Sequence, residues 1–356
     1  GRLLPMGEAH AGQTAALAGL SARPGERIGD GFGLEAPETV PLMSVQVEPT
    51  APLTQSALLA HLREMEEEDP LLSVRPEADG VSVGVMGAVQ VEVLQGILAA
   101  RFGDVVRMCP PHVLYKETIA APAVGIGHYE PLRHYAEVWL KLEPGAPGSG
   151  ISFAADCPPN SLDENWQRLI RTHVFERAHP GVLTGSPLCD VRIRLIAGRA
   201  HLKHTEGGDF REATCRAIRN ALMQAENVLL EPVVRFELAM PNEALARVTG
   251  ELLRIGAQLD ASETDGGETT LTGRCTAAMF WDYPTRFAAS THGHGRIASR
   301  FDRYEPCKNQ DDIVRQSGYD PLADTLNPPG SVFCSHGAGF YVAWDHVREW
   351  AHCEVE

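Results

Sequence analysis

The sequence lacks any apolar run near the roughly 20 residues of a membrane-spanning helix, so it predicts no membrane partner. It also lacks a C-x-x-C pair. Its eight cysteines stand singly, which favours free thiols in a reducing, cytoplasmic setting over disulfides. Basic residues are few relative to acidic ones, 31 against 47, and the formal net charge is -16. Because counterion release at phosphates requires Lys and Arg, this balance argues against DNA binding driven by bulk charge, and leaves local contacts to nucleic acid open.

The length and composition are those of an ordinary folded chain. A length of 356 residues corresponds to about two or three domains. With 44% hydrophobic and 22% charged residues, the chain is not expected to be disordered. It begins without Met in strand-like sequence, and we expect a fragment of a longer protein. Residues 1–41 hold short apolar segments broken by Gly and Pro, which favours the C-terminal part of a β-barrel.

Two stretches of the chain repeat one order of elements. Residues 42–116 read as strand, helix, strand, strand, helix, strand, and residues 232–305 repeat this order around a Thr264–Gly267 turn. The order is that of a ferredoxin-like βαββαβ domain. Helical spacing in the second helix of the first repeat predicts one buried face, made of Val93, Leu94, Ile97 and Leu98.

The segment between the repeats, residues 117–231, predicts strands followed by helices packed on one side, an α+β layer. It ends in a strand, a loop and a helix over residues 191–225, with Asp209 and Glu212 as the predicted capping pair. The loop between them is polar and held by two rigid elements, as binding loops often are. Residues 306–356 form a C-terminal extension, whose aromatic residues are expected to dock on the preceding domain.

Several segments together resemble the elongation factor G family of translational GTPases. The third domain of that family is resembled by PLMSVQVEPT, EEEDPLLSVRPEADGVSVGVMGAVQVEVL and RFGDVVRMCPPHVLYKETI. Its fifth domain is resembled by LLEPVVRFELAMP, GRCTAAMF and GHGRIASRFDRYEPC. Within the family, the sequence is most similar to the tetracycline-resistance ribosomal protection proteins.

The resemblance implies a fold and the cofactors of a larger protein. Residues 1–41, 42–116, 117–231 and 232–305 then correspond to domains II to V, and the fourth domain would be like domain 2 of ribosomal protein S5. GTP and Mg²⁺ belong to the family's G domain, whose G-x-x-x-x-G-K-[ST] loop does not occur here. We therefore expect no catalytic residue, cofactor or metal in this chain, and ribosome-dependent GTP hydrolysis in its parent.

The resemblance also implies two RNA-binding loops. The family's fourth domain reaches into the decoding centre of the small ribosomal subunit with its tip loops. Here they correspond to His201, Leu202, Lys203, His204, Thr205 and Glu206, and to Cys157, Pro158, Pro159 and Asn160. Histidine rings can stack on bases, and a stacked base contributes ~1–3 kcal/mol. The alternative is a solvated loop without a partner.

Three functions follow from this reading. The first is ribosomal protection, in which a monomeric protein binds the ribosome and the tip releases tetracycline from small-subunit rRNA, giving antibiotic resistance. The second is a translocase-like role in moving tRNA and mRNA. The third is a non-catalytic interaction module without a ribosomal role. The same scaffold serves the first two, since a fold does not fix a function.

Two further groups have open interpretations. His128, Arg133 and His134 either face RNA near the tip or make the hydrogen bonds of a hairpin. The tail holds enough Cys and His to suggest zinc, but their spacing is not that of a zinc site, and buried or packing roles are favoured. These tail residues are Cys334, His336, His346, His352 and Cys353.

Overall fold

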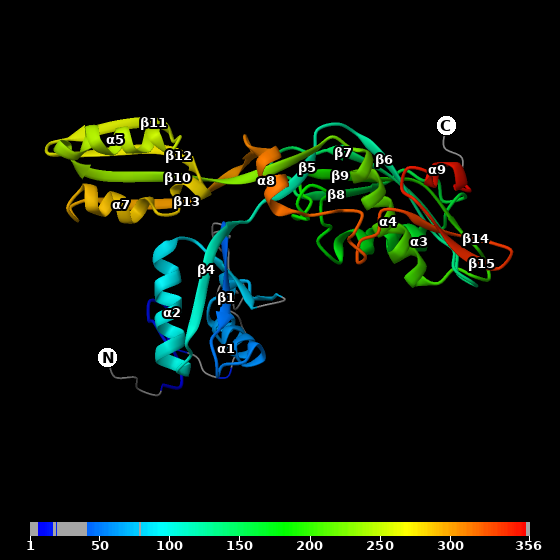
Figure 1. Ribbon diagram of the computed structural model, residues 1–356, viewed down its shortest axis with the longest axis horizontal. Coiled ribbons are helices and arrows are strands. Elements are labelled where there is room, and N and C mark those ends of the chain that lie inside the picture. Colours follow the sequence, from blue (N-terminus) through cyan, green and yellow to red (C-terminus); the bar gives the residue numbers. More distant parts are fainter. Residues whose placement is uncertain (1–5, 17–18, 20–40, 78–79, 354–356) are drawn as a thin grey trace. The chain divides into compact units, whose positions relative to one another are not determined.

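The computed structural model describes residues 6–16, 19, 41–77 and 80–353, in two compact units, residues 1–111 and 112–356 (Figure 1). The partial β-barrel predicted over residues 1–41 lies mostly outside the described residues, and residues 6–16 form neither helix nor strand. Every helix in the described part of the chain is too short or too polar to cross a membrane.

The first unit is a ferredoxin-like layer. Its strands follow the sheet order β2-β3-β1-β4, in which β1 and β3 are antiparallel neighbours. Thr54 caps the first helix, because its hydroxyl accepts a hydrogen bond from the Ala57 backbone N–H at 3.3 Å. The elements are β1 (Met43–Pro49), α1 (Gln55–Glu68), β2 (Arg75–Pro76), β3 (Val81–Val85), α2 (Ala88–Phe102) and β4 (Val106–Val113).

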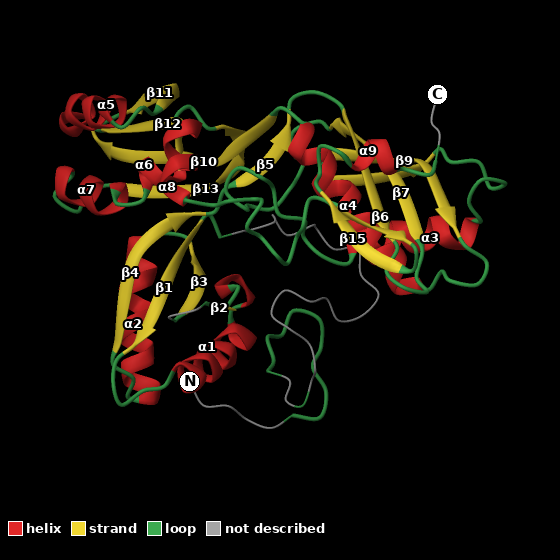
Figure 2. Ribbon diagram, turned by 45° about the vertical axis from the view of Figure 1, so that its right-hand side comes forward, coloured by secondary structure: helices red, strands yellow, loops and turns green. Residues whose placement is uncertain are grey.

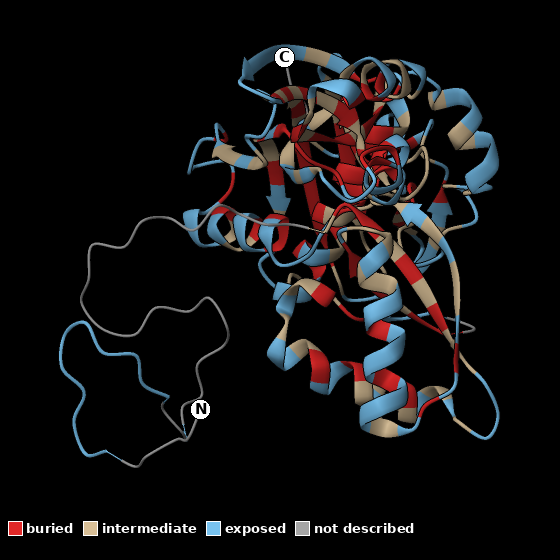
Figure 3. Cartoon of the chain, turned by 90° about the vertical axis from the view of Figure 1, so that its left-hand side faces the viewer, coloured by how far each residue is buried: buried red, intermediate tan, exposed pale blue. Residues whose placement is uncertain are grey.

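The predicted buried face of α2 is only half correct. Leu94 and Leu98 are buried, whereas Val93 is 53% and Ile97 40% exposed. Figure 3, which is coloured by burial, shows helices of the chain that are buried in part and exposed in part. Successive helical residues are rotated by about 100°, so a stripe centred on the 94/98 pair turns the 93/97 pair toward the edge of the contact. The helix therefore packs by a narrower stripe than its apolar spacing indicates.

One domain of the second unit is built on a six-stranded sheet with the strand order β15-β14-β6-β7-β9-β8. Strands β6, β7 and β9 are antiparallel neighbours, and β8 lies parallel to β9. The elements of this domain are β6 (Ala123–Tyr129), β7 (Ala136–Pro144), β8 (Ile151–Ala155), α3 (Glu164–Phe175), β9 (Val191–Ala200), α4 (Gly207–Gln224), β14 (Ser331–Ser335), β15 (Ala338–Val342) and α9 (Val347–Trp350).

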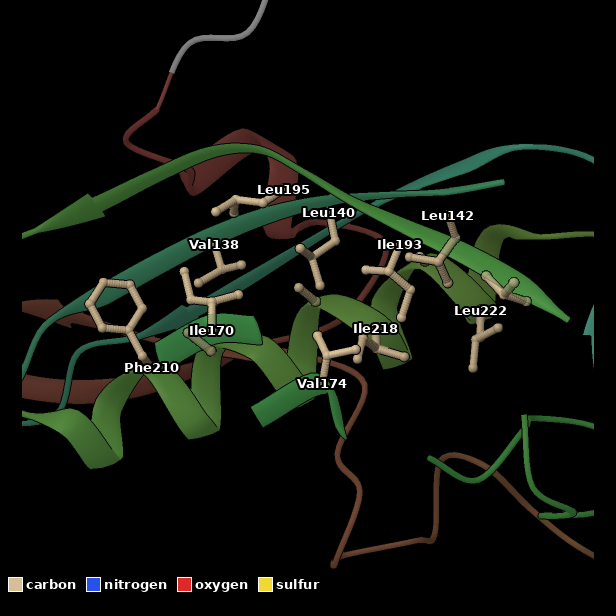
Figure 4. Packing of buried hydrophobic residues seen from close by; sticks show 14 of the residues in the cluster. Val138, Leu140, Leu142, Ile170, Val174, Ile193, Leu195, Phe210, Ile218 and Leu222 are labelled. Atoms are coloured by element: carbon tan, nitrogen blue, oxygen red, sulfur yellow. The ribbon is translucent and has the colours of Figure 1, made fainter. Parts of the chain in front are cut away.

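Helices α3 and α4 cover one face of this sheet (Figures 2 and 4). Val138, Leu140 and Leu142 alternate along β7 and point toward both helices. Facing them are four fully buried or nearly fully buried side chains, Ile170, Val174, Phe210 and Ile218. This core fixes the ends of β9 and α4, and with them the loop that joins the two.

Helix α4 lies very close to β6. An added Cβ would come within 2.0 Å of the Ala217 carbonyl oxygen at Gly125, and within 1.8 Å of the Ala213 carbonyl oxygen at Gly127. Glycine is therefore required at both strand positions for this approach.

The C-terminal segment, residues 331–353, corrects a prediction. It docks on the middle domain and not on residues 232–305, because β14 joins the sheet beside β6. Phe333, Val342 and Val347 form a second core with Ile126 and Trp139, on the sheet face opposite α4. The segment thus covers apolar surface of the sheet that α3 and α4 leave open.

The second ferredoxin-like domain has the strand order β11-β12-β10-β13, with β5 paired to the first part of the long strand β10. The predicted α+β class, two ferredoxin-like units flanking a different layer, is confirmed. The elements are β5 (Lys116–Ile119), β10 (Asn227–Pro241), α5 (Leu245–Arg254), β11 (Gln258–Asp265), β12 (Glu268–Thr276), α6 (Ala277–Phe280), α7 (Tyr283–Ser290), β13 (Arg296–Pro306) and α8 (Gln310–Ser317).

Candidate nucleic-acid interface

Three loops meet at one end of the six-stranded sheet. Tyr129 pairs with Ala136 and Ala136 with Ala200, so the β6–β7 turn lies beside the end of β9. Strand β8 runs parallel to β9, so the loop that follows β8 lies at the same end. Leu162 of that loop packs against Gly198 of β9, where an added Cβ would come within 2.8 Å of the Leu162 side chain. We call residues 130–135, 156–163 and 201–206 together the loop end.

The loop after β9 is braced by one hydroxyl group. Thr205 Oγ1 donates to the Tyr135 carbonyl oxygen at 2.6 Å and accepts from the His201 backbone N–H at 2.7 Å. The Thr205 N–H also donates to the His201 carbonyl oxygen at 3.1 Å. These bonds close a turn, and the His201 ring also accepts from the Lys203 backbone N–H at 3.3 Å. The side chains of residues 201–204 remain exposed.

Helix α4 begins earlier than predicted. Its N-cap is Glu206, and Asp209 is the third helical residue, so the two form a reciprocal capping box. The predicted cap at Asp209 was therefore wrong by one turn. The Asp209 carboxylate also accepts from the backbone N–H of Glu206 at 2.9 Å and contacts His134 Nδ1 at 2.8 Å. One buried carboxylate thus joins the helix start to the β6–β7 turn.

The predicted residues of this loop divide into two groups. His201, Leu202, Lys203 and His204 are exposed, and Leu202 is fully so. The His201 and His204 rings lie 4.5 Å apart at 35°. Thr205 and Glu206 instead hold the loop, as brace and cap.

The second predicted loop is exposed in part. Pro158, Pro159 and Asn160 are exposed, but Cys157 is 4% exposed and belongs to the core. Burial raises the pKa of its thiol. Cys157 is therefore a packing residue, contrary to its predicted place among the RNA-binding residues, since the chain turns inward here before α3.

The three residues left open between two roles separate in the structure. His128 is buried, with Nδ1 2.8 Å from Glu137 and Nε2 3.1 Å from Glu130. His134 is half-buried against Asp209. Both are hydrogen-bonding residues of the hairpin, His128 to Glu137 and Glu130 and His134 to Asp209 of α4, whereas Arg133 is exposed at the turn.

Glu137 fastens the C-terminal segment to the sheet. Its carboxylate accepts from the backbone N–H groups of His352 at 2.8 Å and Cys353 at 2.7 Å, and from Trp139 Nε1 at 2.8 Å. Burial alone would raise the pKa of Glu137, but hydrogen bonds from His128 and from these donors lower it to about 2. The group is therefore a stable buried carboxylate with all of its acceptor positions in use.

A metal reading of this cluster does not hold. Within the described ranges, one group of three metal-binding side chains comes together, His128, Glu137 and His352, with ligand atoms within 4.8 Å of one another. Both Glu137 oxygens already accept two hydrogen bonds each, and both His128 nitrogens have carboxylate partners. Of the tail residues considered for zinc, His352 is the one that joins this group in the described part of the chain.

Two cations of the loop end, and a third beside it at the end of β9, have no acidic partner in the described part of the chain. Arg133, Arg199 and Lys203 make no ion pair with any carboxylate among the residues the structure describes. The same loops also carry Glu130, Asp156, Asp163 and Glu206, so the three cations can contact a phosphate only locally and do not make this region basic overall.

The sequence did not indicate that Tyr135, Glu137, Arg199 and His352 lie together here. One signal was available, because Glu137 is a charged residue inside the apolar run of β7 and such residues are buried only when paired. Nothing in the sequence indicates that His352, about 150 residues from the loop, returns to it.

Two family models match the chain. The model described as elongation factor G, domain IV, matches residues 111–226, and that of the elongation factor G C-terminus matches residues 228–313. A crystal structure of a protein from Thermus thermophilus is similar at 25% identity with a TM-score of 0.65. The match covers 78% of this chain and 43% of that protein, so the chain spans less than half of its length.

Proposed function

Two adjoining elongation factor G domains place this chain in the elongation factor G-like family, and from that premise we propose that it binds the ribosome. The loop end meets small-subunit rRNA at the decoding region. One observation carries the proposal: the braced turn holds His201, Lys203 and His204 outward at the end of domain IV. A rigid loop loses little conformational entropy on binding, and its rings and charge suit unpaired RNA.

Ribosomal protection is the specific role that we propose. The chain acts as a monomer, and its loop end displaces tetracycline from the decoding region by occupying space there. GTP and Mg²⁺ act on a G domain, whose phosphate-binding loop is not in this sequence. The chain itself then binds ribosomes without hydrolysing GTP. The exposed Leu202 at the apex supports a steric role, because an apolar side chain can enter between bases.

Binding to isolated small subunits tests the first part. We expect a variant with His201, Lys203 and His204 changed to Ala to bind about tenfold more weakly, from the loss of stacking and charge. The matched control changes two histidines and one lysine that are exposed outside the loop end, His294, His346 and Lys308. Equal affinity of the two variants would contradict the proposal.

Retention of labelled tetracycline on ribosomes tests protection separately. Saturating chain should lower the amount of bound drug, and the loop variant should not. If the chain binds small subunits and the drug is fully retained, protection is wrong while ribosome binding stands, which favours the translocase-like role.

A further inference from the structure

A hollow of about 690 Å³ lies between the loop after β9 and the C-terminal segment. Its volume is within the ~300–1,000 Å³ typical of small-ligand sites. The lining comes from three parts of the chain: Tyr135 from the β6–β7 turn, Arg199 to Lys203 from the end of β9 and its loop, and His352 from the tail. Neither family model extends to His352, since the second ends at residue 313.

The wall made by His352 is fixed in place. The backbone N–H groups of His352 and Cys353 donate to the buried Glu137 carboxylate, and His352 Nδ1 lies 3.0 Å from Tyr135 Oη. The two rings are within 13° of parallel, with centroids 5.8 Å apart. Two aligned rings, one buried and one exposed, form the flat side of the hollow.

The charges of the hollow match one nucleotide. Arg199 and Lys203 are exposed, and neither has an acidic partner among the described residues. Burial lowers the pKa of His352, and the nearby His128 lowers it further. At neutral pH the His352 ring is then uncharged and flat. Arg199 lies beside it, because its guanidinium donates to the His352 carbonyl oxygen at 3.4 Å, and Lys203 is on the loop after β9.

We infer that the C-terminal segment completes a site for one unstacked nucleotide of single-stranded RNA, with the base against His352 and Tyr135 and its phosphate at Arg199 and Lys203. The inference deepens the proposed function and rests on it, by naming the ligand at the loop end and adding the tail to the RNA-binding surface. A base held in a duplex cannot enter such a hollow, so the site selects unpaired RNA.

Fluorescence anisotropy with a short, unstructured, fluorescein-labelled single-stranded RNA tests the inference on the whole chain. His352→Ala should weaken binding about tenfold, the effect of losing one stacking contact. His352→Phe, which keeps a flat ring, should retain most of the affinity. The control His346→Ala removes an exposed tail histidine outside the hollow and should bind as the unchanged chain.

Two further measurements separate the possible failures. Arg199→Gln with Lys203→Gln alters only exposed side chains, so it should fold normally and still lose RNA affinity. If His352→Ala and His346→Ala bind equally, or if the chain prefers duplex RNA, the inference is wrong. Should small-subunit binding still depend on His201, Lys203 and His204 in that case, the proposed function stands without it.

Discussion

At the scale of single residues, buried carboxylates hold the loop end together. Asp209 joins the start of α4 to the β6–β7 turn, and Glu137 joins β7 to the tail. Each accepts hydrogen bonds from backbone N–H groups, which cannot move away without unfolding local structure. The exposed residues proposed to contact RNA are therefore positioned by two buried carboxylates, Asp209 and Glu137, which do not themselves reach the surface.

Replacing Glu137 by Gln tests this dependence. The amide would turn an N–H group toward at least one of the donors at His128, Trp139, His352 and Cys353, and we expect a loss of about 3 kcal/mol in unfolding free energy. Denaturant titration of both proteins at neutral pH measures the difference. Unchanged stability would contradict the role of Glu137 as the fastening group.

The same pair of proteins has a defined pH dependence. The Glu137 pKa is lowered from 4.5 to about 2 in the folded state, so its contribution is fully present above 4.5 and is lost as the pH falls toward 2. The difference in unfolding free energy between the unchanged protein and Glu137→Gln should therefore become smaller as the pH is lowered from 4.5 toward 2.

At this scale, the sequence could predict features that depend on residues close together in the chain, but not contacts between residues far apart in it. His201 to His204 were predicted as exposed because a polar, glycine-tailed loop lies between two periodic segments. The N-cap was placed at Asp209 instead of Glu206, because both carboxylates take part in one capping box. The pairs Glu137–His352 and Tyr135–His352 could not be predicted, since over 200 residues separate the partners.

At the scale of elements, the approach of α4 to β6 sets the position of the loop after β9. The helix presents Ala213 and Ala217 to a strand that has Gly125 and Gly127 at the crossing. The sequence predicted the helix, but not which strand would lie under it, because that choice depends on sheet order.

Gly127→Ala should destabilise the second unit. Its Cβ would lie 1.8 Å from the Ala213 carbonyl oxygen, so the helix backbone must move, at a cost of ~1–3 kcal/mol or more. Gly208→Ala is the control, because nothing lies within 4 Å of a Cβ there in the first turn of the same helix, and it should be neutral or slightly stabilising. Equal unfolding midpoints in urea would show that β6 and α4 are less closely packed than described.

At the scale of the whole molecule, the chain is acidic overall but, in its described part, has unpaired cations near one end of domain IV. The chain carries 47 acidic and 31 basic residues, so its long-range field repels RNA. Arg133 and Lys203 in the loop end, and Arg199 beside it, still have no ion-pair partner among the described residues. The proposed recognition of RNA then depends on short-range contacts at one end of domain IV, which composition alone could not indicate.

This distribution predicts a shallow salt dependence for binding to single-stranded RNA. Three cations at ~0.7 counterions each give a slope of about -2 for log K against log salt concentration. Replacing Arg199 by Gln should make the slope shallower by ~0.7, whereas His346→Ala should leave it unchanged. Anisotropy titrations over a range of KCl concentrations measure all three slopes. A much steeper slope would mean that a basic surface elsewhere on the chain dominates binding, and an unchanged slope for the Arg199 variant would remove that residue from the phosphate contacts.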